Sequence, residues 1–230
     1  MEILSKKSLV FVVLFVGLSL IGMNLNFSPL VGANNQFFTL FQFWGPVAGG
    51  FLGAGFGIAT VLIAQLANFL LAGKQFELLN ILRLAPMLFA AYYFSKNMQK
   101  NFDDRLSILV PVLAIMVFVA NPVGAQAWYF SLFWLIPIVV KFLPENLILR
   151  SLGATFTAHA VGGAIWAWSV PMTQATWSAL IPVVIYERLL FAGGIAVSYV
   201  IFTNVLNAIE QNSSINVSKI INIERKYLLF

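Results

Sequence analysis

Five polar positions lie inside long apolar stretches of this sequence, where a charged or amide side chain needs a specific role. They are Arg83, His159, Glu187, Arg188 and an amide at Gln65 or Asn68. Because ionisable groups are costly at membrane depth, they usually pair with one another, line a polar path or bind a ligand. The chemistry that these residues can support is therefore ion pairing, proton transfer or ligand recognition.

The adjacent residues Glu187 and Arg188 carry opposite charges. Neighbouring residues of an α-helix point about 100° apart, so we expect each side chain to reach a different helix. Arg83 or His159 is the expected partner of Glu187, either in a structural ion pair or in a site that couples substrate or protons. His159 fits a hydrogen-bonded packing role as well as a functional one. Arg188 fits a structural or subunit-facing charge.

Amide and tryptophan side chains gather near the expected outer ends of the apolar segments. Tryptophan is common at the membrane interface without any ligand. Amides beside tryptophans also suit a pocket for a flat polar molecule, which needs stacking faces and a few directed donors and acceptors. Arg83 suits a carboxylate or phosphate on such a molecule. The predicted substrate-binding residues are Asn34, Asn35, Gln65, Asn80, Arg83, Gln126, Trp128, His159, Trp166 and Glu187.

The composition of the chain is that of a membrane protein. Of its 230 residues, 60% are hydrophobic and only 9% are charged, whereas soluble domains contain about 25% charged residues. The mean hydropathy is +0.91. Runs such as 8–21 are apolar on every face, which excludes the alternating pattern of a transmembrane β-barrel. The sequence predicts an all-α, polytopic transmembrane helical bundle in the plasma membrane.

Eight apolar segments are predicted, which gives six to eight membrane segments. They cover residues 6–23, 34–44, 46–72, 77–96, 106–121, 126–142, 148–169 and 176–208. The second is too short to span as a straight helix, so we expect a tilted half-helix joined to the third at Trp44-Gly45-Pro46. Residues 1–208 are predicted to form a single transmembrane domain. Residues 209–230 are predicted to form a short cytoplasmic tail with a frayed or surface-lying end.

The distribution of Lys and Arg gives the expected orientation. Basic residues concentrate on the cytoplasmic side of membrane proteins, and one threading places both termini there. Uncharged connections such as 24–33, 121–125 and 170–175 then lie outside. Lys74 is the one basic residue on the outer side. This even number of crossings requires the short second segment to cross the membrane.

Glycine recurs at every fourth position near the start of the third segment. The repeat consists of Gly45, Gly49, Gly53 and Gly57. It predicts a helix face without side chains, where another helix can contact the backbone. Ala154, Ala158 and Gly162 have the same spacing, so we expect these two helices to be close neighbours. The glycine face serves internal packing or, alternatively, docks a partner subunit or gates a substrate.

Two stretches resemble a known family. Residues 37–53, FFTLFQFWGPVAGGFLG, look like the Gly-Pro turn and following glycines of the substrate-binding S components of energy-coupling factor (ECF) transporters. Residues 80–96 are similar to their fourth helix, so the resemblance covers roughly residues 8–100. It implies a vitamin or micronutrient carrier that captures substrate outside, under the first loop. A separate transmembrane coupling subunit and ATPase subunits would supply the energy.

Other functions are disfavoured by features that the sequence lacks. With no Cys and a single His, no protein-built zinc or copper site is expected, and no other cofactor is expected. Nucleophile and base sets are missing from the apolar segments, so we expect no catalytic residues and no enzyme. There is no Gly-rich phosphate loop, and the basic residues are too scattered for nucleic acid. An autonomous secondary transporter or channel, and a structural subunit of a larger membrane complex, remain as alternatives.

Overall fold

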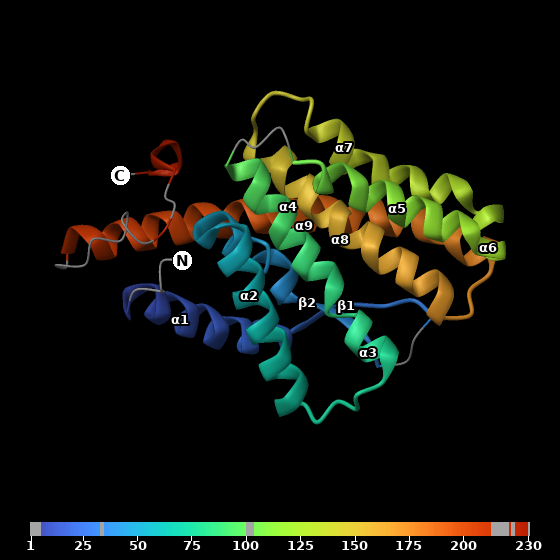
Figure 1. Cartoon of the computed structure of the whole chain (residues 1–230), viewed down its shortest axis with the longest axis horizontal. Coiled ribbons are helices and arrows are strands. Elements are labelled where there is room, and N and C mark those ends of the chain that lie inside the picture. The colour runs from blue at the N-terminus through green and yellow to red at the C-terminus, as the bar shows by residue number, and fades with distance from the viewer. Residues whose placement is uncertain (1–5, 33–34, 100–103, 213–220, 222–223, 230) are drawn as a thin grey trace.

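The computed structural model describes residues 6–32, 35–99, 104–212, 221 and 224–229, which form a helical bundle with one β-hairpin (Figure 1). The first half contains α1 (Lys6–Met23), β1 (Asn26–Pro29), β2 (Phe37–Thr39), the 3₁₀ helix η1 (Leu40–Phe43), α2 (Val47–Leu71), α3 (Leu78–Leu82) and α4 (Ala85–Met98). The second half contains α5 (Leu106–Ala120), α6 (Pro122–Gln126), the 3₁₀ helix η2 (Trp128–Leu135), α7 (Ile136–Val140), α8 (Leu147–Ser169), α9 (Gln174–Asn212) and the 3₁₀ helix η3 (Arg225–Tyr227). The predicted all-α class is confirmed, with the short hairpin as an addition.

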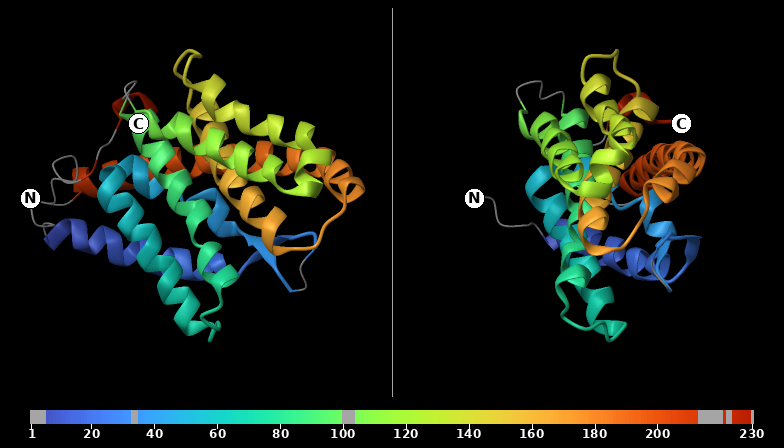
Figure 2. Two further views of the ribbon diagram at one scale, coloured as in Figure 1. Left: turned by 45° about the vertical axis from the view of Figure 1, so that its right-hand side comes forward. Right: turned by 90° about the vertical axis from the view of Figure 1, so that its right-hand side faces the viewer.

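Helix α4 lies at the centre of the bundle, between α2 and α8. The segments α5 to α7 lie on one side of the layer formed by α4 and α8, and α1 and α2 lie on the other (Figure 2). Helix starts follow the local sequence: the Asn146 side chain accepts bonds from the backbone N–H groups of Ile148 and Leu149, as an N-cap does. Phe51 of α2 stacks on Tyr199 of α9, with ring centroids 4.8 Å apart, in the core.

The expected glycine face is interrupted, because Gly53 breaks α2. Its backbone has φ 77° and ψ 174°, a conformation that residues with side chains rarely adopt, and the chain folds back there. A Cβ at Gly57 would collide with the backbone of Gly49, and a Cβ at Gly49 would collide with the carbonyl oxygen of Ala91 in α4. The prediction of one continuous face against residues 154–162 is therefore wrong. The glycines allow the chain to fold back at Gly53 and allow α4 to pack closely against α2. Helix α4 therefore separates α2 from α8.

The predicted half-helix over residues 34–44 is also corrected. The described part of this range contains β2 and η1, and β2 pairs antiparallel with β1, with Ser28 opposite Phe38. Pro46 is the N-cap of α2, and the sharp reversal falls at Gly53 instead of the predicted Trp44-Gly45-Pro46 junction. Phenylalanine and threonine favour strands, and proline suits the first turn of a helix, so the local sequence agrees with the observed arrangement.

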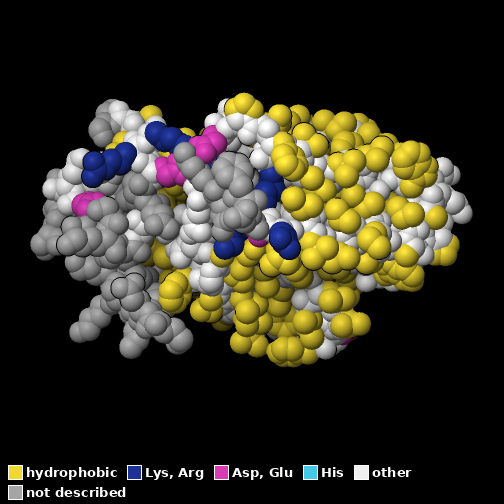
Figure 3. Space-filling view, turned by 45° about the horizontal axis from the view of Figure 1, so that its top comes forward, with side chains coloured by type: hydrophobic (Ala, Val, Ile, Leu, Met, Phe, Trp, Pro, Cys, Tyr) yellow, Lys and Arg dark blue, Asp and Glu magenta, His cyan; other side chains and the backbone are white. Residues whose placement is uncertain are grey.

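Three described helical segments are long and apolar enough to cross a membrane. They are Val47–Leu71, Leu78–Met98 across α3 and α4, and Gln174–Gln211 in α9, and shorter apolar segments cover Phe11–Met23, Leu106–Ala120 and Trp128–Val140. Apolar side chains cover much of one half of the visible face in Figure 3, while charged side chains lie toward the other half. Since soluble monomers rarely expose large contiguous apolar patches, this surface is compatible with a membrane protein.

Charged side chains form ion pairs where α4 ends and α8 begins. Lys141 Nζ lies 4.0 Å from Asp104 Oδ2. The described end of the chain packs here, because Arg150 Nη1 lies 3.4 Å from Glu224 Oε1. Arg150 is only 4% exposed, so the Glu224 carboxylate neutralises a buried cation. Residues 224–229 are therefore anchored on the surface of the bundle, so of the two expected forms of this end, frayed or surface-lying, they take the second.

Candidate ligand-binding site

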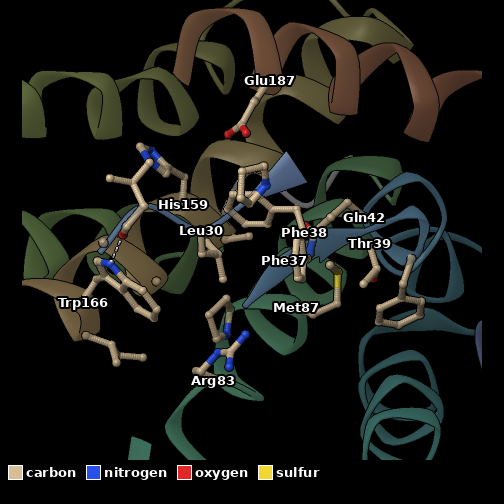
Figure 4. A pocket seen from close by; sticks show the side chains of 18 of the residues that line it. Leu30, Phe37, Phe38, Thr39, Gln42, Arg83, Met87, His159, Trp166 and Glu187 are labelled. Atoms are coloured by element: carbon tan, nitrogen blue, oxygen red, sulfur yellow. Dashed lines mark hydrogen bonds between the residues drawn. The ribbon is translucent and has the colours of Figure 1, made fainter. Parts of the chain in front are cut away.

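A cavity of about 260 Å³ lies beneath the β1–β2 hairpin, between α4, α8 and α9 (Figure 4). Its lining comes from segments that are distant in the sequence. Phe38 belongs to β2, Arg83 to the junction of α3 and α4, His159 and Trp166 to α8, and Glu187 to α9. Aromatic faces with a few polar groups among them are typical of a site for a small molecule.

Six of the ten predicted substrate-binding residues line this cavity. They are Gln65, Asn80, Arg83, His159, Trp166 and Glu187. Asn35 is exposed in the hairpin loop, and Trp128 is 54% exposed at the bundle surface, where interfacial tryptophans are common. The Gln126 carbonyl accepts a hydrogen bond from the Gln174 amide, away from the cavity lining. Asn34 lies outside the described residues.

Three hydrogen bonds tie the hairpin to the helices around the cavity. The donor and acceptor pairs are Ser28 Oγ to Glu187 Oε1 at 2.5 Å, Trp166 Nε1 to the Val31 carbonyl oxygen at 3.0 Å, and the Arg83 guanidinium to Gln36 Oε1. The helical partners lie on α9, on α8 and at the junction of α3 and α4, so the hairpin is held from three directions. We call residues 26–32 and 35–39 the lid, because they cover the cavity.

Glu187 and Arg188 pair with each other, although the expectation that each reaches another element holds in part. Arg188 Nη1 donates to Thr155 Oγ1 of α8 over 3.4 Å, and Glu187 accepts from Ser28 of β1. Arg188 Nη2 lies 3.3 Å from Glu187 Oε2, because the long guanidinium side chain can bend back toward its neighbour. The guanidinium also lies over Phe38 and Phe191, 4.7 Å from each ring centroid. Arg188 is 1% exposed, so it is not subunit-facing. Its Nε has no hydrogen-bond partner among the described residues.

His159 bonds to Trp134 and not to Glu187 as one prediction had it. Trp134 Nε1 donates to His159 Nδ1 over 3.1 Å. Because an indole can only donate, Nδ1 carries no hydrogen, and the neutral ring holds its hydrogen on Nε2. Phe130 and Phe156 pack edge-on against the imidazole. His159 therefore offers one N–H donor from an aromatic wall of the cavity.

Two cations lie across the cavity from Glu187, and Figure 4 shows Arg83 on the side opposite the carboxylate. Pro86 has no N–H for the helical ladder, so the helix breaks just before α4 and places Arg83 at the break. Lys74 approaches from the loop after α2. Partial burial, and to a lesser degree the charge of Arg83, lowers the pKa of the Lys74 amine. With Arg188, the lining holds three cations and one carboxylate.

Several residues of the site are missing from the sequence prediction. They are Ser28, Gln36, Phe38, Lys74 and Trp177. Lys74 carries a signal in the sequence, because it is the one basic residue on the outer side in the predicted threading. Gln36 and Trp177 belong to the amides and tryptophans that gather near the expected outer ends, whereas Ser28 and Phe38 carry no such signal, since only the pairing of β1 with β2 brings them over the cavity.

Comparisons of this chain with protein-family models, with curated proteins and with solved structures found no match. The site is therefore interpreted from its own geometry. It combines an aromatic cavity, an excess of positive charge, several hydrogen-bond donors and a lid held by polar contacts. This arrangement is suited to enclosing a small molecule.

Proposed function

We propose that this protein is the membrane-embedded substrate-binding subunit of a micronutrient uptake transporter, similar to the S component of an ECF transporter. The single observation that carries the proposal is the cavity beneath the hairpin. It lies under the first connection after α1, where the sequence resemblance places the substrate. The substrate in this proposal is a vitamin-like small molecule, and the lid covers it after capture.

In the proposed orientation, the cavity opens outside the cell, and both termini lie in the cytoplasm of a multi-pass plasma-membrane protein. Lys96, Lys141 and Arg150 line a second, small pocket at the opposite end of α4 and α8, which suits the cytoplasmic side under the positive-inside rule. In this proposal, the segment that leads to the reversal at Gly53 counts as a further pass before α2 continues, which gives eight passes and an even number of crossings.

The energy for uptake comes from separate subunits in this proposal. The sequence has no Gly-rich phosphate loop followed by Gly-Lys-Ser or Gly-Lys-Thr, which is the usual cradle for ATP phosphates. A transmembrane coupling subunit and ATPase subunits are therefore the proposed partners, together with the lipid bilayer and the small-molecule substrate. The protein itself acts in recognition and not as an enzyme.

Native mass spectrometry of the full-length protein, purified in detergent from its own host, tests the proposal. We expect a retained small molecule and co-purification of a coupling membrane protein with ATPases. Reconstitution in liposomes is the second measurement, with uptake expected only when those subunits and ATP are present. A protein that is empty and firmly bound to unrelated membrane subunits would instead indicate a structural subunit.

A second candidate function, proton-coupled secondary transport, is favoured by one observation. His159 and Glu187 both line the same cavity, and groups of this kind relay protons in membrane transporters. The liposome experiment separates the two functions. Uptake by the protein alone, driven by a pH gradient, would contradict the ATP-dependent proposal and support this one.

A further inference from the structure

Lys74 and Arg83 differ from the buried cations of the bundle, one of which, Arg188, lines the same cavity. Lys141, Arg150 and Arg188 each have a carboxylate partner within 4.0 Å. Among the described residues, Lys74 and Arg83 form no ion pair, although both line the cavity. Arg83 is half-buried and Lys74 is exposed beside it, and two like charges near each other favour the binding of an anion between them. The missing partner of this pair is a negative group.

Arg83 has the geometry to hold that group. Its Nη1 donates to Gln36 on the lid, and the described residues provide no acceptor for its other N–H groups. A guanidinium presents a planar fork of donors that matches the two oxygens of a carboxylate. Lys74 adds a second charge at the same side, and the lowered pKa of its amine reflects partial burial next to Arg83.

The other residues of the lining determine which ring system of a ligand fits the cavity. Phe38, Trp166 and Trp177 offer aromatic surface, and the Trp166 N–H is already used by the Val31 carbonyl, so this indole contributes its ring to the cavity. Planar rings are the natural partners of such faces. At the wall opposite Arg83, His159 has its Nε2 hydrogen available, which calls for an acceptor on the ligand.

We infer that the cavity binds a flat organic anion in one orientation. Its acidic group lies on Arg83 and Lys74, its ring lies between the aromatic side chains, and a ring nitrogen or carbonyl accepts from His159. The inference rests on the proposed function in one respect, which is that the cavity is the ligand-binding site. It goes further by assigning the charge and the polarity of the substrate.

Matched probes test the charge preference on the full-length protein in detergent. The acids are pyridine-3-carboxylate and indole-3-acetate, and each is compared with its own carboxamide by titration calorimetry and thermal shift. We expect each acid to bind at least about tenfold more tightly than its amide, because a charge-assisted, bidentate hydrogen bond is lost in the amide. Replacing pyridine-3-carboxylate by benzoate, which lacks the ring nitrogen, is expected to weaken binding, and His159→Phe is expected to remove that difference.

Variants separate the charge of Arg83 from its contact with the lid. Arg83→Gln and Lys74→Gln are expected to reduce the preference for acid over amide to less than about threefold. Gln36→Ala removes the lid contact but keeps both cations, so it is expected to change the binding of acid and amide by similar factors. Arg105→Gln, outside the cavity lining, is the control for a general loss of positive charge.

The outcomes distinguish the inference from the proposed function. Equal or tighter binding of the amides contradicts the inference and leaves a binding function intact. An unchanged acid preference in both Arg83→Gln and Lys74→Gln also contradicts it. A protein that binds none of the acids and none of the amides contradicts the inference, and if it also retains no small molecule from its host, it contradicts the proposed function.

Discussion

The carboxylate of Glu187 connects the lid to the buried interior of α9. One oxygen accepts from Ser28 at 2.5 Å, and the other lies 3.3 Å from Arg188 Nη2. Arg188 in turn packs on Phe38 of the lid. A buried guanidinium that loses its carboxylate is strongly unfavourable, whereas the loss of one hydrogen bond to that carboxylate costs less. The two contacts of Glu187 are therefore expected to differ in energy.

Glu187→Gln is expected to lower the free energy of unfolding by about 3–5 kcal/mol, because it leaves Arg188 buried without a counter-charge. Ser28→Ala removes only the lid contact, a hydrogen bond to a charged group, and is expected to cost about 1.5–3 kcal/mol. Chemical unfolding in detergent, followed by tryptophan fluorescence, measures both variants. Equal stabilities of Glu187→Gln and the unchanged protein would show that the ion pair contributes little.

Asp104 is expected to make stability depend on pH at the opposite end of the bundle. Burial acts to raise the pKa of its carboxyl, but hydrogen bonds from Ser107 and Tyr92 and the charge of Lys141 outweigh burial and hold the pKa below its usual value. A lowered pKa in the folded state stabilises the protein above the unfolded pKa of about 3.9. That contribution is lost as the pH falls through the folded pKa.

Asp104→Asn is therefore expected to lower Tm at pH 7, and its difference from the unchanged protein is expected to shrink below about pH 4. Differential scanning fluorimetry in detergent between pH 3 and pH 8 measures this difference. Glu77→Gln, at an exposed position, is the control and is expected to change Tm little. A difference that stays constant down to pH 3 would contradict the role of the Asp104 charge.

Breaks in two helices position the cavity. The break before α4, caused by Pro86, places Arg83 at the lining, and Gln65 Nε2 donates to the Leu84 carbonyl at the same break, over 3.1 Å. The reversal at Gly53 turns the first part of α2 back on the second. The close approach of Gly49 to α4 then fixes the position of these helices relative to each other. Small residues are required where backbones meet this closely.

Gly49→Ala tests this contact, because the new Cβ would overlap the backbone carbonyl of Ala91, which cannot rotate away. We expect a loss of about 1–3 kcal/mol in the free energy of unfolding, as for other overpacked sites. Gly55→Ala is the matched control on the same helix, since a Cβ there has nothing within 4 Å, and its higher helix propensity predicts equal or greater stability. Equal effects of the two substitutions would contradict the packing role of Gly49.

The molecule as a whole has a charged end and a cavity end, separated by apolar sides. Ion pairs of Lys141, Arg150 and Lys226 gather at the charged end, while Lys74 and Arg83 lie at the cavity. A lipid bilayer would cover the apolar sides between them. The proposed topology therefore places these two ends in different compartments.

Single cysteines can test this topology directly, because the chain contains no Cys. In intact cells, Gln75→Cys near the cavity is expected to react with a membrane-impermeant maleimide, and Lys226→Cys is expected to react only after permeabilisation. The unchanged, cysteine-free chain is the labelling control. The reverse pattern would invert the orientation, and reaction of both positions in intact cells would mean an even number of crossings between them, which contradicts the proposed topology.

Much of this architecture is readable from composition along the chain. The helical class, the apolar segments near α4, α5, α8 and α9, and six of the cavity residues follow from hydropathy and from the cost of polar groups in lipid. These properties are local, so each segment carries its own signal. The positions of the reversal at Gly53 and of the β-hairpin are harder to predict from the sequence, because glycine and phenylalanine fit several local structures.

The composition of the cavity depends on contacts between distant residues. Ser28 meets Glu187 across 159 positions of the chain, and Trp166 meets Val31 across 135, so no local pattern contains either bond. The same holds for the charge balance of the site, since folding brings Lys74 and Arg83 to one wall and pairs Arg188 with Glu187 at another. Hydropathy along the chain specifies which segments are apolar enough to cross a membrane, whereas side-chain packing between those segments specifies which polar groups line the cavity.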